Sequence, residues 1–203
     1  MYFLGRGLCR VYLRLTGGYS SYGKANIPPK GGFLIAPNHI SYLDPPVVGS
    51  GIPRMIHFMA KEPLFRIPVI GPFIRSVGTF PVRQGTADRA AIRRAIELLA
   101  DGRVVCIFPE GTRSPDANLL TPVLGFAMIA LKSRIPIVPT AIFGSEKSLS
   151  HKHPLPRFAH VKVVYGQPMT FDDLYDNPDR EAQEEVGRRV MNTISKMLEQ
   201  EPK

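Results

Sequence analysis

GGFLIAPNHISYLDPP, residues 31–46, is the stretch that decides how this chain is expected to fold. The apolar run after the two glycines predicts a buried strand, and an aspartate followed by a proline, Asp44 and Pro45, is a common start of a helix. Asn38 and His39 therefore fall just past the carboxyl end of the strand. In open parallel sheets, that edge is where ligands bind.

The pair formed by His39 and Asp44 has two interpretations. In the simpler one, Asp44 caps the helix and His39 is only a loop residue. In the other, the loop turns into the helix so that the two side chains face each other, although five residues on a regular helix would set them roughly 140° apart. A carboxylate that accepts a hydrogen bond from one imidazole nitrogen leaves the other nitrogen free to take a proton. The spacing alone leaves both interpretations open.

Around this stretch, strand-like and helix-like segments alternate along the chain. Short apolar runs predict strands at 33–36, 56–59, 104–108, 137–142 and 161–165. The clearest helix is TADRAAIRRAIELLADG, residues 86–102, with Thr86 as its expected N-cap, Asp88 in its first turn and Gly102 at its end. This alternation predicts an α/β fold with a largely parallel central sheet flanked by helices.

Two more helices are predicted at the ends of the chain. Residues 179–200 carry apolar side chains at helical spacing and are expected to pack on the domain surface. Residues 2–15 form an amphipathic helix in which Arg6, Arg10 and Arg14 line one side, and the sequence GGYSSYG then breaks the pattern. We therefore expect an N-terminal amphipathic basic helix over 1–18 and one α/β domain over 19–203.

Charge and composition narrow the classes of partner. Residues 1–171 hold 21 Lys and Arg against 8 Asp and Glu, a balance of +13, whereas residues 172–203 hold 5 against 9, a balance of −4. The body should attract anions such as nucleic acid, an anionic membrane or phosphorylated small molecules. No nucleic-acid module is recognisable, so nucleic acid is not expected as a partner.

The lack of a predicted transmembrane helix, the lack of a secretory signal and the position of Cys106 indicate the cellular compartment. No run of about 18 uncharged apolar residues occurs, so no transmembrane helix is predicted, and arginines interrupt the apolar N-terminus in a way that a secretory signal would not. Cys106 lies in the apolar run VVCIF and is expected to be a buried thiol. We read this as favouring a reducing, cytosolic compartment.

A second polar stretch, CIFPEGTRSP at residues 106–115, follows another predicted strand and should lie on the same sheet edge as His39. The guanidinium of Arg113 is suited to a forked contact with a phosphate. The alternative is a polar turn with a surface Glu–Arg pair. Arg83 ends a third stretch, VGTFPVRQG at 77–85, and IPIVPTAI at 135–142 is expected to be a buried strand with no side chain suited to chemistry.

Together these stretches resemble the glycerolipid acyltransferase family, most closely its bacterial 1-acylglycerol-3-phosphate acyltransferases. NHISYLD matches the family's N-H-x-x-x-x-D signature and FPEGTRS its E-G-T-R signature, while GTFPVR and IPIVP stand at the places of its second and fourth blocks. The resemblance covers about residues 25–170. It implies that His39 acts as a general base oriented by Asp44. It implies that the acceptor is bound by Arg83, Glu110, Gly111, Thr112 and Arg113.

The sequence departs from the family pattern in its second block. The family usually ends that block with an arginine after another charged residue, and here Val82, Arg83 and Gln84 stand in a row. Either Arg83 contacts the phosphate from one position earlier, or Gln84 replaces the arginine and acceptor binding is altered.

The resemblance implies transfer of a fatty acyl group from acyl-CoA or acyl carrier protein to the sn-2 hydroxyl of 1-acyl-glycerol-3-phosphate (lysophosphatidic acid), giving phosphatidic acid. No metal or prosthetic group is implied. An acyl tunnel is expected near Phe58, Met59, Leu64, Phe65 and Phe73. The alternatives are the same chemistry on glycerol 3-phosphate or another lysophospholipid, and a non-catalytic peripheral membrane protein.

The expected location is the cytoplasmic face of the cell membrane, as a peripheral protein. There, the N-terminal helix would dip its apolar side into the interface while its three arginines meet the headgroups of an anionic membrane surface. The alternative is that this helix simply packs on the domain.

Overall fold

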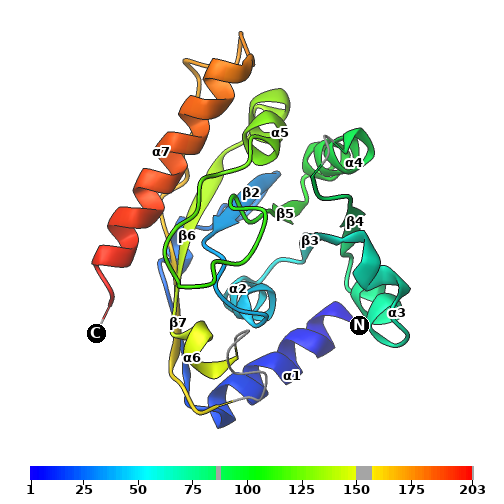
Figure 1. Cartoon of the computed structure of the whole chain (residues 1–203), viewed down its shortest axis with the longest axis vertical. Helices are drawn as coiled ribbons and strands as arrows, with labels where there is room; N and C mark the ends of the chain where they lie inside the picture. The colour runs from blue at the N-terminus through cyan, green and yellow to red at the C-terminus, as the bar shows by residue number, and fades with distance from the viewer. Residues whose placement is uncertain (86–87, 150–156, 203) are drawn as a thin grey trace.

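A seven-stranded sheet forms the centre of the computed structural model, which describes residues 1–85, 88–149 and 157–202 (Figure 1). The strands are β1 (Tyr19–Tyr22), β2 (Phe33–Pro37), β3 (Ile56–Lys61), β4 (Phe80–Val82), β5 (Val104–Cys106), β6 (Ile137–Phe143) and β7 (Val161–Tyr165). The α-helices are α1 (Tyr2–Leu15), α2 (Asp44–Gly51), α3 (Ile70–Ser76), α4 (Arg89–Ala100), α5 (Gly125–Ser133), α6 (Ser145–Ser148) and α7 (Arg180–Glu199), and the 3₁₀ turns are η1 (Lys24–Asn26) and η2 (Glu62–Arg66).

The strand order is β1-β7-β6-β2-β5-β3-β4, and every neighbouring pair is parallel except β6 with β7. The predicted α/β fold with a largely parallel sheet is thus confirmed. The break of the helical pattern at GGYSSYG is confirmed, because α1 ends at Leu15, but residues 19–22 also form β1, a strand that the sequence analysis did not predict. This edge strand pairs with β7 through its backbone. Its polar side chains therefore give no apolar run from which a strand is predicted.

Alternate residues of the central strands belong to two separate hydrophobic cores, one on each face of the sheet. Leu34 and Ala36 of β2 face the core under α4, α5 and α7, whereas Phe33 and Ile35 face the core under α2 and α1. Figure 1 shows these two groups of helices on opposite faces of the sheet. Cys106 lies in the second core and is fully buried, as predicted.

The helices of the sequence analysis are confirmed with one change at an N-terminus. Asp88, expected in the first turn of α4, is itself the N-cap, and its carboxylate accepts from the amides of Ala90 and Ala91 at 3.2 Å. Thr86, the expected N-cap, lies outside the described residues. No helix in the part of the chain that the structure describes is long and apolar enough to span a membrane.

Three adjacent strands bring the predicted site together. β2 lies between β5 and β6 and runs parallel to both, so the loops after their carboxyl ends meet at one edge. The stretch after β2 carries His39, and the stretch after β5 carries Glu110 and Arg113. The predicted buried strand at 137–142 is β6, whose end borders the same edge.

Candidate active site

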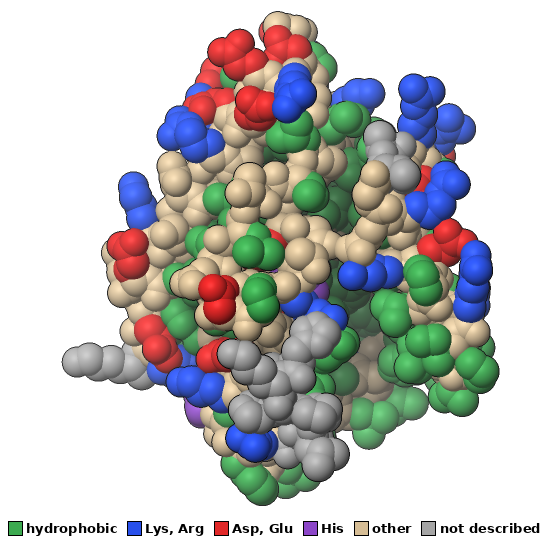
Figure 2. Space-filling model, viewed as in Figure 1, with side chains coloured by type: hydrophobic (Ala, Val, Ile, Leu, Met, Phe, Trp, Pro, Cys, Tyr) green, Lys and Arg blue, Asp and Glu red, His purple; other side chains and the backbone are tan. Residues whose placement is uncertain are grey.

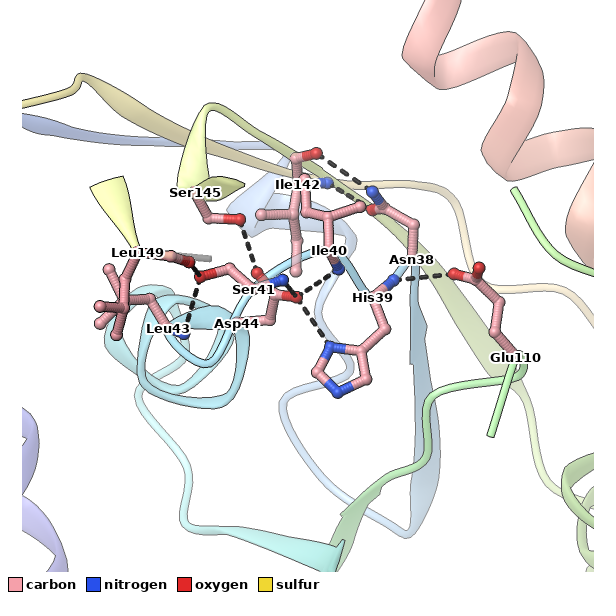
Figure 3. A network of polar contacts seen from close by, with 10 residues as sticks. All are labelled: Asn38, His39, Ile40, Ser41, Leu43, Asp44, Glu110, Ile142, Ser145 and Leu149. Atoms are coloured by element: carbon pink, nitrogen blue, oxygen red, sulfur yellow. Dashed lines mark hydrogen bonds and ion pairs between the residues drawn. The ribbon is translucent and has the colours of Figure 1, made fainter. Parts of the chain in front are cut away.

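His39 and Asp44 face each other in the structure (Figure 3). The imidazole Nδ1 lies 2.8 Å from Oδ2 of Asp44, and the Asp44 side chain is fully buried. A carboxylate is an acceptor, so Nδ1 carries the hydrogen and Nε2 presents its lone pair. In Figure 3 the Nε2 side of the ring points away from the other labelled residues. The geometry has the form of a base held by a carboxylate.

The Asp44 carboxylate is also satisfied by three other donors. Oδ2 accepts from the backbone amides of Ile40 and Ser41, both at 2.7 Å. Oδ1 accepts from the hydroxyl of Ser145 at 2.6 Å. A buried charge is tolerated only when it is paired and hydrogen-bonded, and this one has four donors. Asp44 therefore shapes the loop before α2 and fixes the imidazole, whereas the expectation that it caps the helix is wrong, because the N-cap of α2 is Leu43 and no side chain caps it.

Asn38 ties the same loop to β6. Its side-chain amide donates to the carbonyl of Ile142 at 3.2 Å, and its side-chain oxygen accepts from the amide of Ile142 at 2.7 Å. The amide side chain thus continues the hydrogen bonding of the sheet after the β2 strand has ended. Ser145 stands just past the end of β6 and reaches Asp44. Sequence reasoning missed the roles of Asn38 and Ser145, because only the strand order reveals their partners.

Phe108 packs on the imidazole and was also missed. Its ring stacks on His39 with the centroids 3.8 Å apart and an interplanar angle of 22°. Phe108 follows β5, and β5 pairs with β2. This contact, together with the bond to Asp44, holds the plane of the His39 ring. The sequence shows Phe108 as the first residue of FPEGTRS. That Phe108 contacts His39 follows only from the pairing of β5 with β2.

Glu110 braces the backbone and does not point at an open pocket. Oε1 accepts from the amide of His39 at 2.8 Å and Oε2 from the amide of Leu120 at 2.9 Å. The residue is buried, and burial raises the pKa of its carboxyl, while the two backbone amides oppose that shift. The sequence analysis placed Glu110 among the acceptor-binding residues, with a surface Glu–Arg pair as the alternative. In the structure, its two oxygens are engaged by backbone amides instead.

Arg113 lies over an aromatic ring beside the His39 loop. Its guanidinium carbon is 3.5 Å from the centroid of Tyr42. The next residue, Ser114, donates its amide to the carbonyl of His39 at 2.8 Å, which keeps Arg113 close to the dyad. Nη1 of Arg113 is buried and has no hydrogen-bond acceptor within residues 1–85, 88–149 and 157–202. A buried charged donor without a partner carries a desolvation cost.

The turn before Arg113 depends on Gly111. The residue has φ of 67°, a left-handed conformation that favours glycine, and an added Cβ would lie 3.2 Å from Val123. Thr112 is exposed on the same turn. The structure therefore brings Gly111, Thr112 and Arg113 together next to His39, as the sequence predicts.

Arg83 and Gln84 diverge at the end of β4. The backbone amide of Arg83 bonds Asp88 at 2.9 Å and its Nε approaches the same oxygen at 3.4 Å, while its side chain remains two-thirds exposed. The Gln84 side chain instead donates to the carbonyl of Gly111. The second block thus reaches the site through Gln84, and Arg83 is turned toward the start of α4.

An apolar groove of about 220 Å³ lies between α1 and the start of α2, and it is lined by Leu8, Cys9, Tyr12, Leu13, Leu43 and Pro46. None of the residues expected to line an acyl tunnel borders it. Leu64 and Phe73 are exposed, at 39% and 51%, whereas Phe65 is buried. Within the described residues, no three His, Cys, Asp or Glu side chains are placed to hold a metal ion.

Comparisons with known proteins identify the family of this chain. Residues 19–143 match the acyltransferase family. A 1-acyl-sn-glycerol-3-phosphate acyltransferase of Bacillus subtilis is 35% identical over 184 residues, covering 89% of this chain and 88% of its own. The chloroplast enzyme BAT2 of Brassica napus, with the same activity in its name, is 31% identical over 65% of this chain, which spans only 39% of that longer relative.

A solved structure supports the same assignment. The crystal structure of PlsC, a 1-acyl-sn-glycerophosphate acyltransferase from Thermotoga maritima, matches with a TM-score of 0.82 at 25% identity. The match covers 98% of this chain and 78% of that one. The sequence blocks, the sheet-edge site and these relatives point the same way, and the chain is therefore an enzyme of the acyltransferase family.

Proposed function

We propose that the protein transfers a fatty acyl group from an acyl thioester, carried by coenzyme A or acyl carrier protein, to the sn-2 hydroxyl of 1-acyl-glycerol-3-phosphate. The product is phosphatidic acid. The observation that carries the proposal is the His39–Asp44 pair beside a buried arginine nitrogen that lacks an acceptor. Several relatives bear the name of this activity.

In the proposed mechanism, the nucleophile belongs to the acceptor. Nε2 of His39 takes the proton of the acceptor hydroxyl as its oxygen attacks the thioester carbonyl carbon. The tetrahedral intermediate collapses, the C–S bond breaks, and the imidazolium returns the proton to the departing thiolate. Asp44 stabilises the imidazolium with its negative charge and holds the ring, while Phe108 fixes the ring plane. No serine or cysteine nucleophile is needed.

Arg113 is the proposed phosphate ligand, because its buried Nη1 offers a charged donor close to the dyad. Gly111 and Thr112 shape the turn that presents it. Arg83 is proposed to add positive charge at the rim of the site, and Gln84 to hold the turn through Gly111. Glu110 is proposed to act on the acceptor site only indirectly, through the backbone that it braces.

Replacing Arg113 with alanine is expected to raise KM for the phosphorylated acceptor about tenfold to a hundredfold with little change in kcat, because a charge-assisted contact contributes about 1.5–3 kcal/mol to ground-state and transition-state binding alike. Initial rates against acceptor concentration measure both constants. Arg94→Ala, an exposed arginine on α4, is the matched control. An unchanged KM in Arg113→Ala would remove Arg113 from the acceptor site.

A panel of acceptors tests the reaction itself. Purified protein is given one acyl thioester with 1-acyl-glycerol-3-phosphate, glycerol 3-phosphate or another lysophospholipid, and acylated products are quantified. We expect phosphatidic acid to be the main product, and none from His39→Ala above background. Preference for a different acceptor would reject the proposed substrate and keep the acyl-transfer chemistry, whereas no transfer to any acceptor would reject both.

We also propose that α1 attaches the protein to a membrane through its apolar side. Exposed large side chains on α1 are Phe3, Leu4, Leu8, Val11 and Leu15. The region of η2 and α3 adds Ile67, Val69, Ile70 and Phe73, and Phe73 lies 4.0 Å from the position of an added Cβ on Gly5 of α1. Figure 2 shows hydrophobic side chains gathered over α3. An exposed apolar surface of this kind fits a lipid interface.

The expectation that three arginines of α1 face the headgroups is wrong for two of them. Arg6 and Arg10 donate hydrogen bonds to backbone carbonyls of Ile52 and Ser50, inside the domain. Only Arg14 of the three is exposed. The helix therefore both packs on the domain and shows an apolar side to solvent.

Replacing Leu4, Leu8 and Val11 together with serine is expected to weaken sedimentation with liposomes at least about tenfold, because each large apolar side chain contributes about 1.5–3 kcal/mol when it leaves water. Zwitterionic vesicles should show the loss as clearly as anionic ones. Arg14→Gln, on the same helix, should matter only for anionic vesicles. Undiminished sedimentation of the triple variant would refute attachment through α1.

A further inference from the structure

The helix that carries Asp44 has little stability of its own. α2 contains only eight residues, DPPVVGSG, and isolated helices of this length do not persist in water. Its two prolines suit the first turn, but Gly49 and Gly51 in its last turn each disfavour a helix. The last four carbonyls of a helix also lack partners within it. The carboxyl end of α2 must therefore be held by other parts of the protein.

Arg6 and Arg10 of α1 supply much of that support. Nε of Arg10 donates to the carbonyl of Ser50 at 2.7 Å, and Nη1 of Arg6 donates to the carbonyl of Ile52, the C-cap residue, at 2.5 Å. Positive charge is favourable at this end, where the helix dipole is negative. The two arginines stand one helical turn apart on α1, so they reach two carbonyls at the carboxyl end of α2, those of Ser50 and Ile52.

Two tyrosines complete the set, Tyr165, which is buried, and Tyr19, which is partly buried. Tyr19 of β1 donates to the carbonyl of Val47 at 3.0 Å, and Tyr165 of β7 donates to that of Val48 at 2.7 Å. Burial raises the pKa of Tyr19 to about 12, so its hydroxyl remains a donor at neutral pH. The tyrosines hold the middle of α2 from the sheet side, and the arginines hold its end from α1.

We infer that Arg6 and Arg10 are positioning residues for the His39–Asp44 pair, which they hold in register by fixing the far end of the helix that begins at Asp44. The inference rests on the proposed role of that pair. Eight residues span only about 12 Å, so a shift or fraying at the carboxyl end of α2 moves its first turn as well. Displacing catalytic groups by about 1 Å costs up to about a hundredfold in rate. α1 therefore serves catalysis independently of a membrane.

The test uses the full chain without a membrane. The assay contains an acyl thioester and a short-chain acceptor below its micelle concentration, at a temperature at which thermal unfolding shows every variant folded. We expect Arg6→Ala with Arg10→Ala to lower kcat about tenfold to a hundredfold while KM changes less than about threefold. The milder Arg10→Gln should lower kcat in the same direction. Arg10→Lys, which keeps a charged donor, should recover most of the rate.

Arg14→Ala is the matched control, because it removes the same charge from the same helix at an exposed position. It should have the kcat of the unaltered protein. A second readout is the downfield proton resonance of the His39 Nδ1–H bonded to Asp44, which should weaken or disappear in the double variant and persist in Arg14→Ala. General loss of stability would lower the fraction of folded protein without moving this signal in the molecules that remain folded.

Two results would overturn the inference: equal kcat in the double variant and Arg14→Ala, or an unchanged imidazole resonance in the double variant. Neither would affect the proposed function, which is tested separately by the acceptor panel and by His39→Ala. The role of Arg6 and Arg10 and the proposed function can therefore be rejected independently of each other.

Discussion

Replacing His39 with alanine is expected to lower kcat by a factor on the order of 10²–10⁴, the usual contribution of a positioned general base. The physical reason is that Nε2 has no substitute. Asp44 is fully buried and engaged by four donors, so it cannot take the proton of an acceptor in place of the imidazole. Glu110 is likewise occupied by two backbone amides. KM for the acceptor should change little, because Arg113 and its turn remain.

Steady-state rates with a fixed thioester and varied acceptor measure this effect. His160→Ala removes an imidazole that pairs with Ser20 outside the site and should keep the rate of the unaltered protein. His39→Gln keeps a side-chain donor of similar reach for Asp44 but no base, so it should be as inactive as the alanine variant. Full transfer by His39→Ala would leave the His39–Asp44 pair as a structural contact of the loop before α2 and no more.

Asp44→Asn is expected to lower kcat by about 10²–10⁴, as the loss of the carboxylate does in other histidine-based sites, while KM changes far less. Two backbone amides and the imidazole all donate toward Oδ2. The amide oxygen of asparagine must take that place, since an NH₂ group there would face three donors. Its NH₂ then meets the hydroxyl of Ser145, which can rotate to accept. The substitution thus preserves the geometry and removes the charge that stabilises the imidazolium.

Asp44→Ala separates the structural role from the catalytic one. It leaves two buried amides and a buried hydroxyl without an acceptor, and the expected loss in the free energy of unfolding is about 3 kcal/mol or more. Denaturant unfolding of both variants checks this difference. If Asp44→Asn instead raised KM strongly with kcat intact, Asp44 would only brace the loop before α2 and have no part in proton transfer.

Much of the fold could be read from local sequence patterns. Apolar runs long enough to be buried marked β2, β3, β5, β6 and β7, and the alternation with helices required a parallel sheet. β1 and β4 were not predicted as strands because both lie at the edges of the sheet, where β1 is polar and Pro81 interrupts the short β4. A strand of that kind is stabilised by pairing with its neighbour, which leaves no periodic signal in its own side chains.

The chemical groups of the site were also visible in the sequence, whereas their partners were not. His39, Asp44 and Arg113 stand in motifs that are specific in combination. The contacts that give them their roles join residues far apart along the chain: Ser145 with Asp44, Phe108 with His39, and Glu110 with the His39 amide. The Glu110 expectation shows the limit, because a carboxylate beside an arginine in sequence does not reveal which way it points.

The sequence by itself determined the alternation of strands and helices, the edge on which the polar loops lie, and the identity of the groups available for proton transfer and anion binding. These properties depend on hydrophobic periodicity and on residue type, which are local. Only the tertiary structure decided that Arg6 and Arg10 turn inward to α2 and leave an apolar side of α1 in solvent. Amphipathic periodicity shows that a helix has two sides, but the carbonyls left unpaired at the end of a neighbouring helix decide which side faces the domain.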